Sequence, residues 1–162
     1  MSDFLPTGYE APVSSGGYMK FQAGDNLFRV LSSAIVGYEY WTTESKPIRS
    51  KVPFTEMPDI KKDSKPKHFW AFIVWNYATK NVEILEITQS TIMSAITNLV
   101  ADSDWGSPKE YDIKVSRSGE GIETEYSVSP KPHKAVDGDI QMAYADKKIN
   151  LEALYEGANP FA

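Results

Sequence analysis

The sequence predicts an all-β domain with one helix: a five-stranded, partly open barrel with the helix between strands 3 and 4, the element order of the OB-fold. Three observations predict it. Five segments are rich in β-branched and aromatic residues and are bounded by turns. One segment near residues 88–102 instead has apolar residues at helical spacing. That helical segment follows the third strand and precedes the fourth.

Composition divides the chain into three regions. Residues 1–18 contain Pro6, Pro12, Gly16 and Gly17 and few core residues, which indicates a flexible arm. Residues 19–132 hold all five strands and form the expected domain. Residues 133–162 are an acidic C-terminal segment, in which residues 140–155 can form an amphipathic helix before a short tail.

The first strand is expected to be long and bent. Residues 27–31 alternate in character, Ser32-Ser33 interrupts them, and residues 35–42 resume the pattern, with Gly37 suited to a bend or bulge. Alternation places three side chains of the second half on one face: Val36, Tyr38 and Tyr40. It places Ile35, Glu39 and Trp41 on the other. A long polar, lysine-rich connection follows over residues 43–67, with short strand-like pieces inside it.

Residues 68–77 are apolar at nearly every position, which indicates a strand covered on both faces. A strand of a soluble barrel needs cover on only one face, because its other face can meet water. The second aromatic face of this strand therefore needs a partner.

Residues 82–87 form the neighbouring strand after a turn at 78–81. If Tyr77 pairs with Val82, one face collects the expected core: Phe69, Ala71, Ile73, Trp75 and Tyr77. The other face, with Trp70, Phe72, Val74 and Asn76, then points outward. A slip of one residue would reverse this assignment.

Thr88 is expected to cap the helix, and Ile92, Ile96 and Leu99 form its apolar stripe before it ends near Asp102. Residues 111–117 alternate as a half-buried strand. Residues 123–128 form the last strand, which Pro130 and Pro132 stop.

Composition excludes several classes of protein. The chain has no cysteine, so disulfides, thiolate catalysis and Cys-ligated zinc are excluded. Its two histidines lie in no metal-ligand spacing, and no phosphate-binding glycine motif occurs, so we expect neither enzymatic activity nor a cofactor. It has no membrane-spanning run and no signal peptide, so a cytoplasmic protein without a membrane partner is expected.

Charge is distributed unevenly along the chain. The net charge is −5, which by itself argues against a polyanionic partner. Between residues 46 and 80, however, eight basic residues stand against three acidic ones. A solvated lysine-rich loop explains this as readily as a binding surface does.

Aromatic surface beside basic charge suits single-stranded nucleic acid, whose bases stack and whose phosphates need cations. In an OB-fold, strands 2 and 3 and their loops bind oligonucleotides, and the aromatic strand and the basic loop lie there. The candidate binding residues are Tyr38, Tyr40, Trp41, Lys46, Arg49, Lys51, Lys65, Lys67, Trp70 and Phe72. The alternatives are that these aromatics belong to the core, or that they form a protein-interaction surface.

Three stretches also resemble a known family: residues 24–31, residues 35–41, and residues 67–72, together with Glu86-Ile87-Thr88-Gln89. Over roughly residues 21–132 the sequence resembles phage-encoded single-stranded DNA-binding proteins. The resemblance implies an OB-fold that coats single-stranded DNA in replication or recombination, in the host bacterial cytoplasm. It also implies that the C-terminal segment recruits replication proteins. The zinc site of the T4-type members cannot carry over, because this chain has no cysteine.

Overall fold

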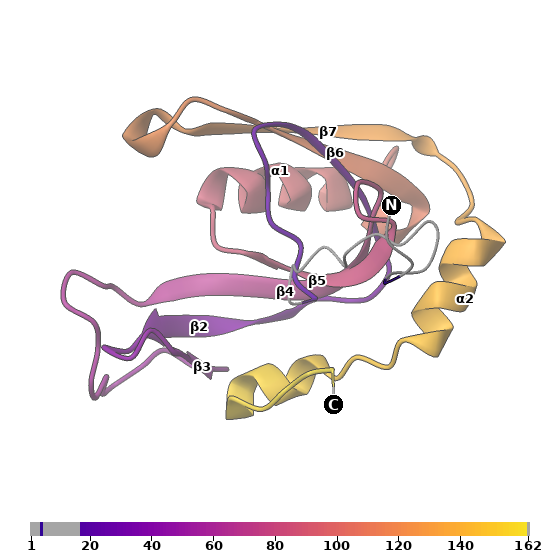
Figure 1. Ribbon diagram of the computed structural model, residues 1–162. Helices are drawn as coiled ribbons and strands as arrows, with labels where there is room; N and C mark the ends of the chain where they lie inside the picture. The colour runs from indigo at the N-terminus through magenta and orange to yellow at the C-terminus, as the bar shows by residue number, and fades with distance from the viewer. Residues whose placement is uncertain (1–3, 5–16, 162) are drawn as a thin grey trace.

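The computed structural model describes Phe4 and residues 17–161, which form one β-sheet with helices packed on it (Figure 1). The strands are β1 Gly24–Val30, β2 Ile35–Trp41, β3 Pro47–Ser50, β4 Lys67–Asn76, β5 Asn81–Ile87, β6 Tyr111–Ser118 and β7 Glu125–His133. The helices are α1 Ser90–Ala101 and α2 Gly138–Asp146, with short 3₁₀ turns η1 Pro108–Glu110, η2 Gly121–Glu123 and η3 Leu151–Glu156. The mostly-β prediction is confirmed, whereas the expected arm lies almost entirely outside the described residues.

The central strand is β4. Its ten residues are long enough to pair with β2 over Lys67–Ala71 and with β1 over Val74–Asn76 along one edge, and with β5 along the other. The full order is β3-β2-β4-β1-β6-β7, with β5 on the second edge of β4. The elements are therefore arranged around β4, whose sequence predicted a doubly covered strand.

The expected bent first strand is present as β1 and β2, separated by residues 31–34. The break lies at Ser32, whose hydroxyl accepts a hydrogen bond from the Ile73 amide at 2.9 Å. The predicted bend at Gly37 is wrong, since Gly37 lies within β2. A Cβ there would lie 2.3 Å from the Ser50 carbonyl oxygen, so this glycine allows β3 to approach closely.

The predicted pairing of Tyr77 with Val82 is wrong by two residues, because Trp75 is the residue opposite Val82. An even shift preserves the two faces, since side chains alternate with a period of two. Phe69, Ala71 and Ile73 of the expected core face are buried, but the face expected to point outward is largely buried as well. Phe72 and Val74 lie in the main core and are 4% and 0% exposed, whereas the sequence predicted that they point outward.

We call the face of β2, β4 and β5 that is directed toward α1 the inner face, and the opposite one the outer face. On the inner face, Ile92 and Ile96 of α1 pack with side chains of β4, β5, β1 and β6 in the largest apolar cluster. The cluster consists of Met19, Phe28, Val30, Phe72, Val74, Leu85, Ile87, Ile92, Ile96, Tyr111, Ile113 and Val115.

The sheet is not closed into a barrel. Within the described residues β5 has no ladder with β7, and α1 packs against β7 between the two halves of the sheet (Figure 1). The physical reason is that the apolar stripe of α1 fills the space that direct pairing of these strands would close. A five-stranded barrel was predicted, and the structure shows an open sheet instead.

Three local predictions need correction. The N-cap of α1 is Gln89 rather than Thr88, and it makes no side-chain capping bond. Strand β7 continues through Pro130 and Pro132, because it pairs only with β6 and an edge strand tolerates missing amide donors. The single amphipathic helix expected over residues 140–155 is instead two short pieces, α2 and η3.

Candidate functional site

The outer face of β4 is covered by the chain's own C-terminal segment. Phe69 and Ala71 of β4, Ile84 of β5 and Leu154 of η3 form a second buried apolar cluster. Each of the four is no more than 3% exposed. The sequence predicted core positions for Phe69 and Ala71, and both are buried, but against a partner outside the strands. That partner is residues 147–161, which we call the cover.

Polar contacts hold the cover as well. The Lys147 ammonium donates to the Val82 carbonyl at 2.7 Å, and the Tyr155 hydroxyl donates to the Val36 carbonyl. Lys51 of the long connection pairs with Glu152 at 3.4 Å and lies 5.1 Å from the centre of the Tyr155 ring. Burial raises the pKa of Tyr155, so this hydroxyl remains a donor at neutral pH. These contacts come from three separate elements, so the cover is anchored along its length.

The inner face is only partly covered toward the start of β4. Here alternation and pairing bring together four side chains, which we call the aromatic strip: Val36, Tyr38, His68 and Trp70. Val36 is 50% exposed, His68 is exposed, and Tyr38 and Trp70 are half-buried. The rings of Tyr38 and His68 lie 5.3 Å apart, and His68 Nδ1 lies 2.8 Å from the Gly37 carbonyl, which fixes its orientation.

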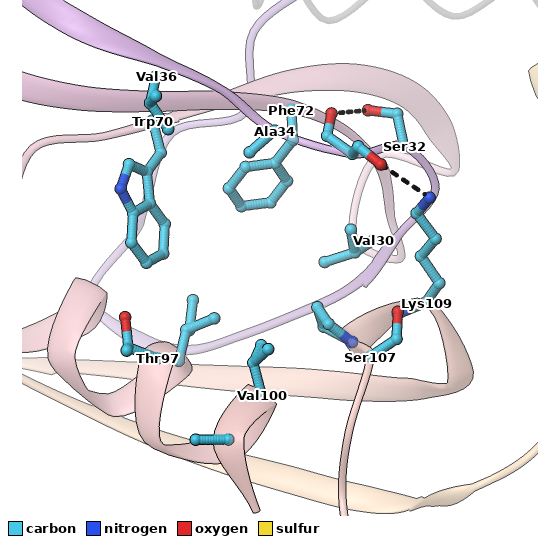
Figure 2. Close-up of a pocket in the computed structure, with 14 residues that line it drawn as sticks. Val30, Ser32, Ala34, Val36, Trp70, Phe72, Thr97, Val100, Ser107 and Lys109 are labelled. Carbon is cyan, nitrogen blue, oxygen red and sulfur yellow. Dashed lines mark hydrogen bonds between the residues drawn. The ribbon is translucent and has the colours of Figure 1, made fainter.

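A cavity of about 570 Å³ adjoins the strip at Trp70 (Figure 2). Phe72 lies on its sheet side, and Thr97 and Val100 of α1 face it from the opposite side. Its remaining lining comes from the turn between β1 and β2 and from the segment around η1. Trp70 thus borders both the open strip and the cavity.

Two of the predicted aromatic residues lie elsewhere. Tyr40 is 2% exposed; its hydroxyl donates to the Pro58 carbonyl at 3.1 Å, and its ring packs on Phe54. Tyr40 therefore anchors the long connection and has no ring surface free for stacking. Trp41 is 40% exposed on the opposite face of β2, beside Lys61 and Lys62 in a separate hollow.

The predicted basic residues divide into three groups. Lys65 and Lys67 are exposed at the start of β4. Lys46 is exposed and lies 3.7 Å from Glu44, while Lys51 is engaged by the cover. Arg49 is buried, with only 8% of its side chain exposed, so the structure does not present it to solvent.

The Arg49 guanidinium instead forms ion pairs with two carboxylates. It lies 3.3 Å from Glu39 and 2.7 Å from Glu86, and its guanidinium stands 5.7 Å from the centre of the Phe69 ring. One cation balances only one of the two negative charges. Burial, reinforced by the neighbouring Glu86, raises the pKa of Glu39 to about 8, so at neutral pH a proton balances the second charge. This group holds β2, β3 and β5 together beneath the cover.

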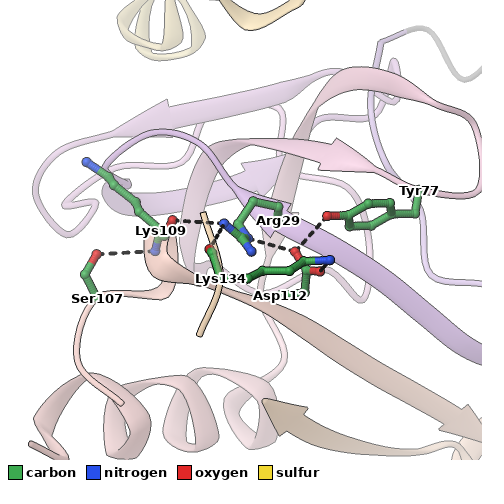
Figure 3. A network of polar contacts seen from close by, with 6 residues as sticks. All are labelled: Arg29, Tyr77, Ser107, Lys109, Asp112 and Lys134. Atoms are coloured by element: carbon green, nitrogen blue, oxygen red, sulfur yellow. Dashed lines mark hydrogen bonds and ion pairs between the residues drawn. The ribbon is translucent and has the colours of Figure 1, made fainter. Parts of the chain in front are cut away.

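A second buried ion pair joins β1 to β6 (Figure 3). Arg29 donates to Asp112 at 2.7 Å and to the carbonyls of Lys109 and Lys134. The Tyr77 hydroxyl donates to the same carboxylate at 2.8 Å, and burial with this bond raises the pKa of Tyr77 to about 12. These contacts fix the segment around η1, which carries the exposed Lys109 to the rim of the cavity.

Sequence reasoning missed Lys109, Ser33 and Val100 as lining residues. They come from three distant segments, and none stands in a motif. His68 of the strip stands in no motif either, and its contact with Tyr38 depends on the β2–β4 register. The same register puts Tyr38, Trp70 and Phe72 on one face, although Phe72 is buried there.

The described residues contain no group of three or more histidine or acidic side chains that could hold a metal ion. None of the described helices has the length and hydropathy needed to cross a membrane.

Comparison with known proteins gives a distant relative. The chain is 23% identical over 138 residues to a protein of Escherichia phage T5 named "Probable ssDNA-binding protein". The match covers 68% of this chain and 53% of that protein, so the chain spans about half of its relative's length. No family model matches the sequence, and no solved structure matches the fold.

Proposed function

We propose that this protein binds single-stranded DNA without sequence preference and without catalysing a reaction, in phage DNA replication or recombination. The observation that carries the proposal is the open aromatic strip on β2 and β4, whose β4 half, His68 and Trp70, lies within the most basic part of the chain. Stacking of a base on an aromatic ring contributes about 1–3 kcal/mol and is tolerant of sequence, because every base has a π-face.

The exposed cations next to the strip suit the phosphates. Lys65 lies just before β4 and Lys67 is its first residue, three and one residues before His68. A strand lying along β4 with its bases on the strip would pass the start of β4, where both lysines stand. The distant phage T5 relative, by its name, supports the same class of ligand.

The fold is consistent with this use. We propose that the sheet is an open variant of the OB-fold, in which β1 and β2 together correspond to strand 1, β4 and β5 to strands 2 and 3, and β6 and β7 to strands 4 and 5. Helix α1 then occupies its expected place between strands 3 and 4. The outer face of β4 is closed by the cover, so we assign the bases to the inner strip.

A titration of intrinsic tryptophan fluorescence with oligo-dT over a series of salt concentrations tests the proposal. We expect quenching, with an affinity that falls steeply as salt rises, since phosphate contacts release counterions. Absence of binding at low salt would overturn it. The negative net charge would then favour the second candidate, a protein-interaction module that uses the same aromatic strip.

A further inference from the structure

The cavity next to Trp70 has two chemically different ends (Figure 2). Near Trp70 its walls are apolar, formed by Val36, Phe72 and Val100. At the other end it is bordered by hydroxyl groups and by an ammonium group, those of Ser33, Ser107 and Lys109. A ligand that uses both ends needs a flat apolar part and an anionic part.

Lys109 is positioned for an anion. Its ammonium donates to the Ser33 hydroxyl at 3.1 Å, and its backbone amide donates to Ser107, which caps the short turn η1. The ion pairs among the described residues do not include Lys109. Its side chain is exposed, and Arg29 binds its carbonyl from below, so the backbone is fixed while the charge remains available.

Trp70 is positioned for a ring. It pairs with Val36 across the β2–β4 ladder, and its half-buried indole borders the apolar end of the cavity. The cavity volume of about 570 Å³ is in the range of small-molecule sites, which are mostly apolar with a few polar groups that fix orientation. An aliphatic ligand would leave Lys109 unused, and a free phosphate would leave the apolar walls unused.

We propose that this cavity receives one nucleotide of the bound strand, with its base against Trp70 and its phosphate at Lys109. The inference rests on the proposed function and goes further, because it assigns one base to a pocket between the sheet and α1 while its neighbours lie on the open strip. A strand held in this way has a fixed position on the protein. The strip alone would allow the strand to slide.

The test uses a ligand too short to span the strip. Thymidine and thymidine 5′-monophosphate are titrated against the full chain, with tryptophan fluorescence as the readout. We expect the monophosphate to bind more tightly than the nucleoside, because only the monophosphate offers an anion to Lys109. Lys109→Ala should remove that difference and leave the affinity for the nucleoside unchanged.

A second pair of variants fills the cavity. Val100 is 49% exposed on α1 and lines the cavity, whereas Asn98 is exposed on the same helix and does not line it. Val100→Phe should weaken both the monophosphate and oligo-dT by about fivefold or more, the equivalent of one lost stack. Asn98→Phe should leave both affinities unchanged.

The outcomes separate this inference from the proposed function. Normal oligo-dT binding by Val100→Phe and Lys109→Ala would overturn the cavity site and leave strip binding intact. Equal affinity of the wild-type chain for thymidine and thymidine 5′-monophosphate would also overturn the cavity site. If the wild-type chain binds neither oligo-dT nor the monophosphate, both proposals fail, and an apolar side chain of a partner protein becomes the candidate occupant.

Discussion

The two faces of β4 carry similar side chains but are covered by different segments. On the outer face, Phe69 and Ala71 lie beneath Leu154 of the cover. On the inner face, Phe72 lies in the main core beneath α1, Trp70 is half-buried at the edge of that core, and His68, nearer the start of the strand, is exposed. Aromatic content therefore does not reveal which surface is open. The outer face is closed because the cover, more than seventy residues further along the chain, packs on it.

The two apolar clusters on the faces of β4 also differ in size. The inner cluster has twelve buried members, whereas the outer one has four and is supported by an exposed ion pair between Lys51 and Glu152. Exposed ion pairs contribute only about 0–1 kcal/mol. We therefore expect the outer cover to detach locally before the inner core opens.

The largest expected effect compares the two cores directly. Phe72→Ala should lower the free energy of unfolding by about 3–5 kcal/mol, because it leaves a cavity in the main core. Leu154→Ala should cost less, about 2 kcal/mol, since the cover can detach without global unfolding. Urea denaturation followed by circular dichroism measures both. Equal losses would mean that the cover and the core unfold as one unit.

The second prediction concerns binding. Trp70→Ala should weaken oligo-dT binding by about 1–3 kcal/mol, because it removes one stacking surface of the strip. Trp41→Ala serves as the matched control, since Trp41 is exposed on the other face of β2. A larger loss for Trp41→Ala would move the binding site to the outer side, beside Lys61 and Lys62.

The third prediction uses the carboxylate pair beneath the cover. The folded-state pKa of Glu39, about 8, lies above its ordinary value of 4.5, so folding favours the protonated form. Its contribution to stability is complete below pH 4.5 and is lost as the pH rises to about 8. The free energy of unfolding should therefore fall across this interval, and less steeply in Glu39→Gln. An identical pH profile in the variant, with exposed Glu44→Gln as control, would contradict the shared-proton arrangement.

The fourth prediction removes the C-terminal segment. The residues after Pro132 include five acidic side chains and three lysines, and they engage Lys51. Deleting them should raise the affinity for oligo-dT at low salt several-fold, because it frees a cation and removes net negative charge. Gel filtration must first confirm that the shortened chain is monodisperse, since the deletion uncovers Phe69 and Ala71. Unchanged or weaker binding would count against competition between the segment and DNA.

The smallest effect concerns the exposed lysines. Lys65→Ala and Lys67→Ala should each weaken oligo-dT binding modestly and reduce the salt dependence of the affinity by about 0.7 in the logarithmic slope, the value for one phosphate contact. Lys80→Ala, which changes an exposed lysine in the β4–β5 turn, is the control. A slope that stays constant in both variants would show that these lysines do not contact phosphate.

The sequence by itself determined the strands, the helix and their order, because hydrophobic periodicity and turn residues are local signals. It also predicted that both faces of β4 are apolar, and along most of the strand both are buried, although the inner face is open at His68 and Trp70. It grouped Tyr38 with Tyr40, and Trp70 with Phe72, because alternation along a strand is a local property.

Only the tertiary structure decided which face is the core and what covers the other. Alternation defines two faces and does not order them, and α1 fixed that order by packing on Phe72 and Val74. Nothing near β4 in the chain predicts that Leu154 covers Phe69, or that Lys109 lies near Trp70 across the cavity. The sequence shows Arg49 only as a basic residue. In the structure its side chain is buried, because carboxylates from two separate strands, those of Glu39 and Glu86, converge on it. Contacts between distant segments depend on the packing of the whole chain, and no local pattern records them.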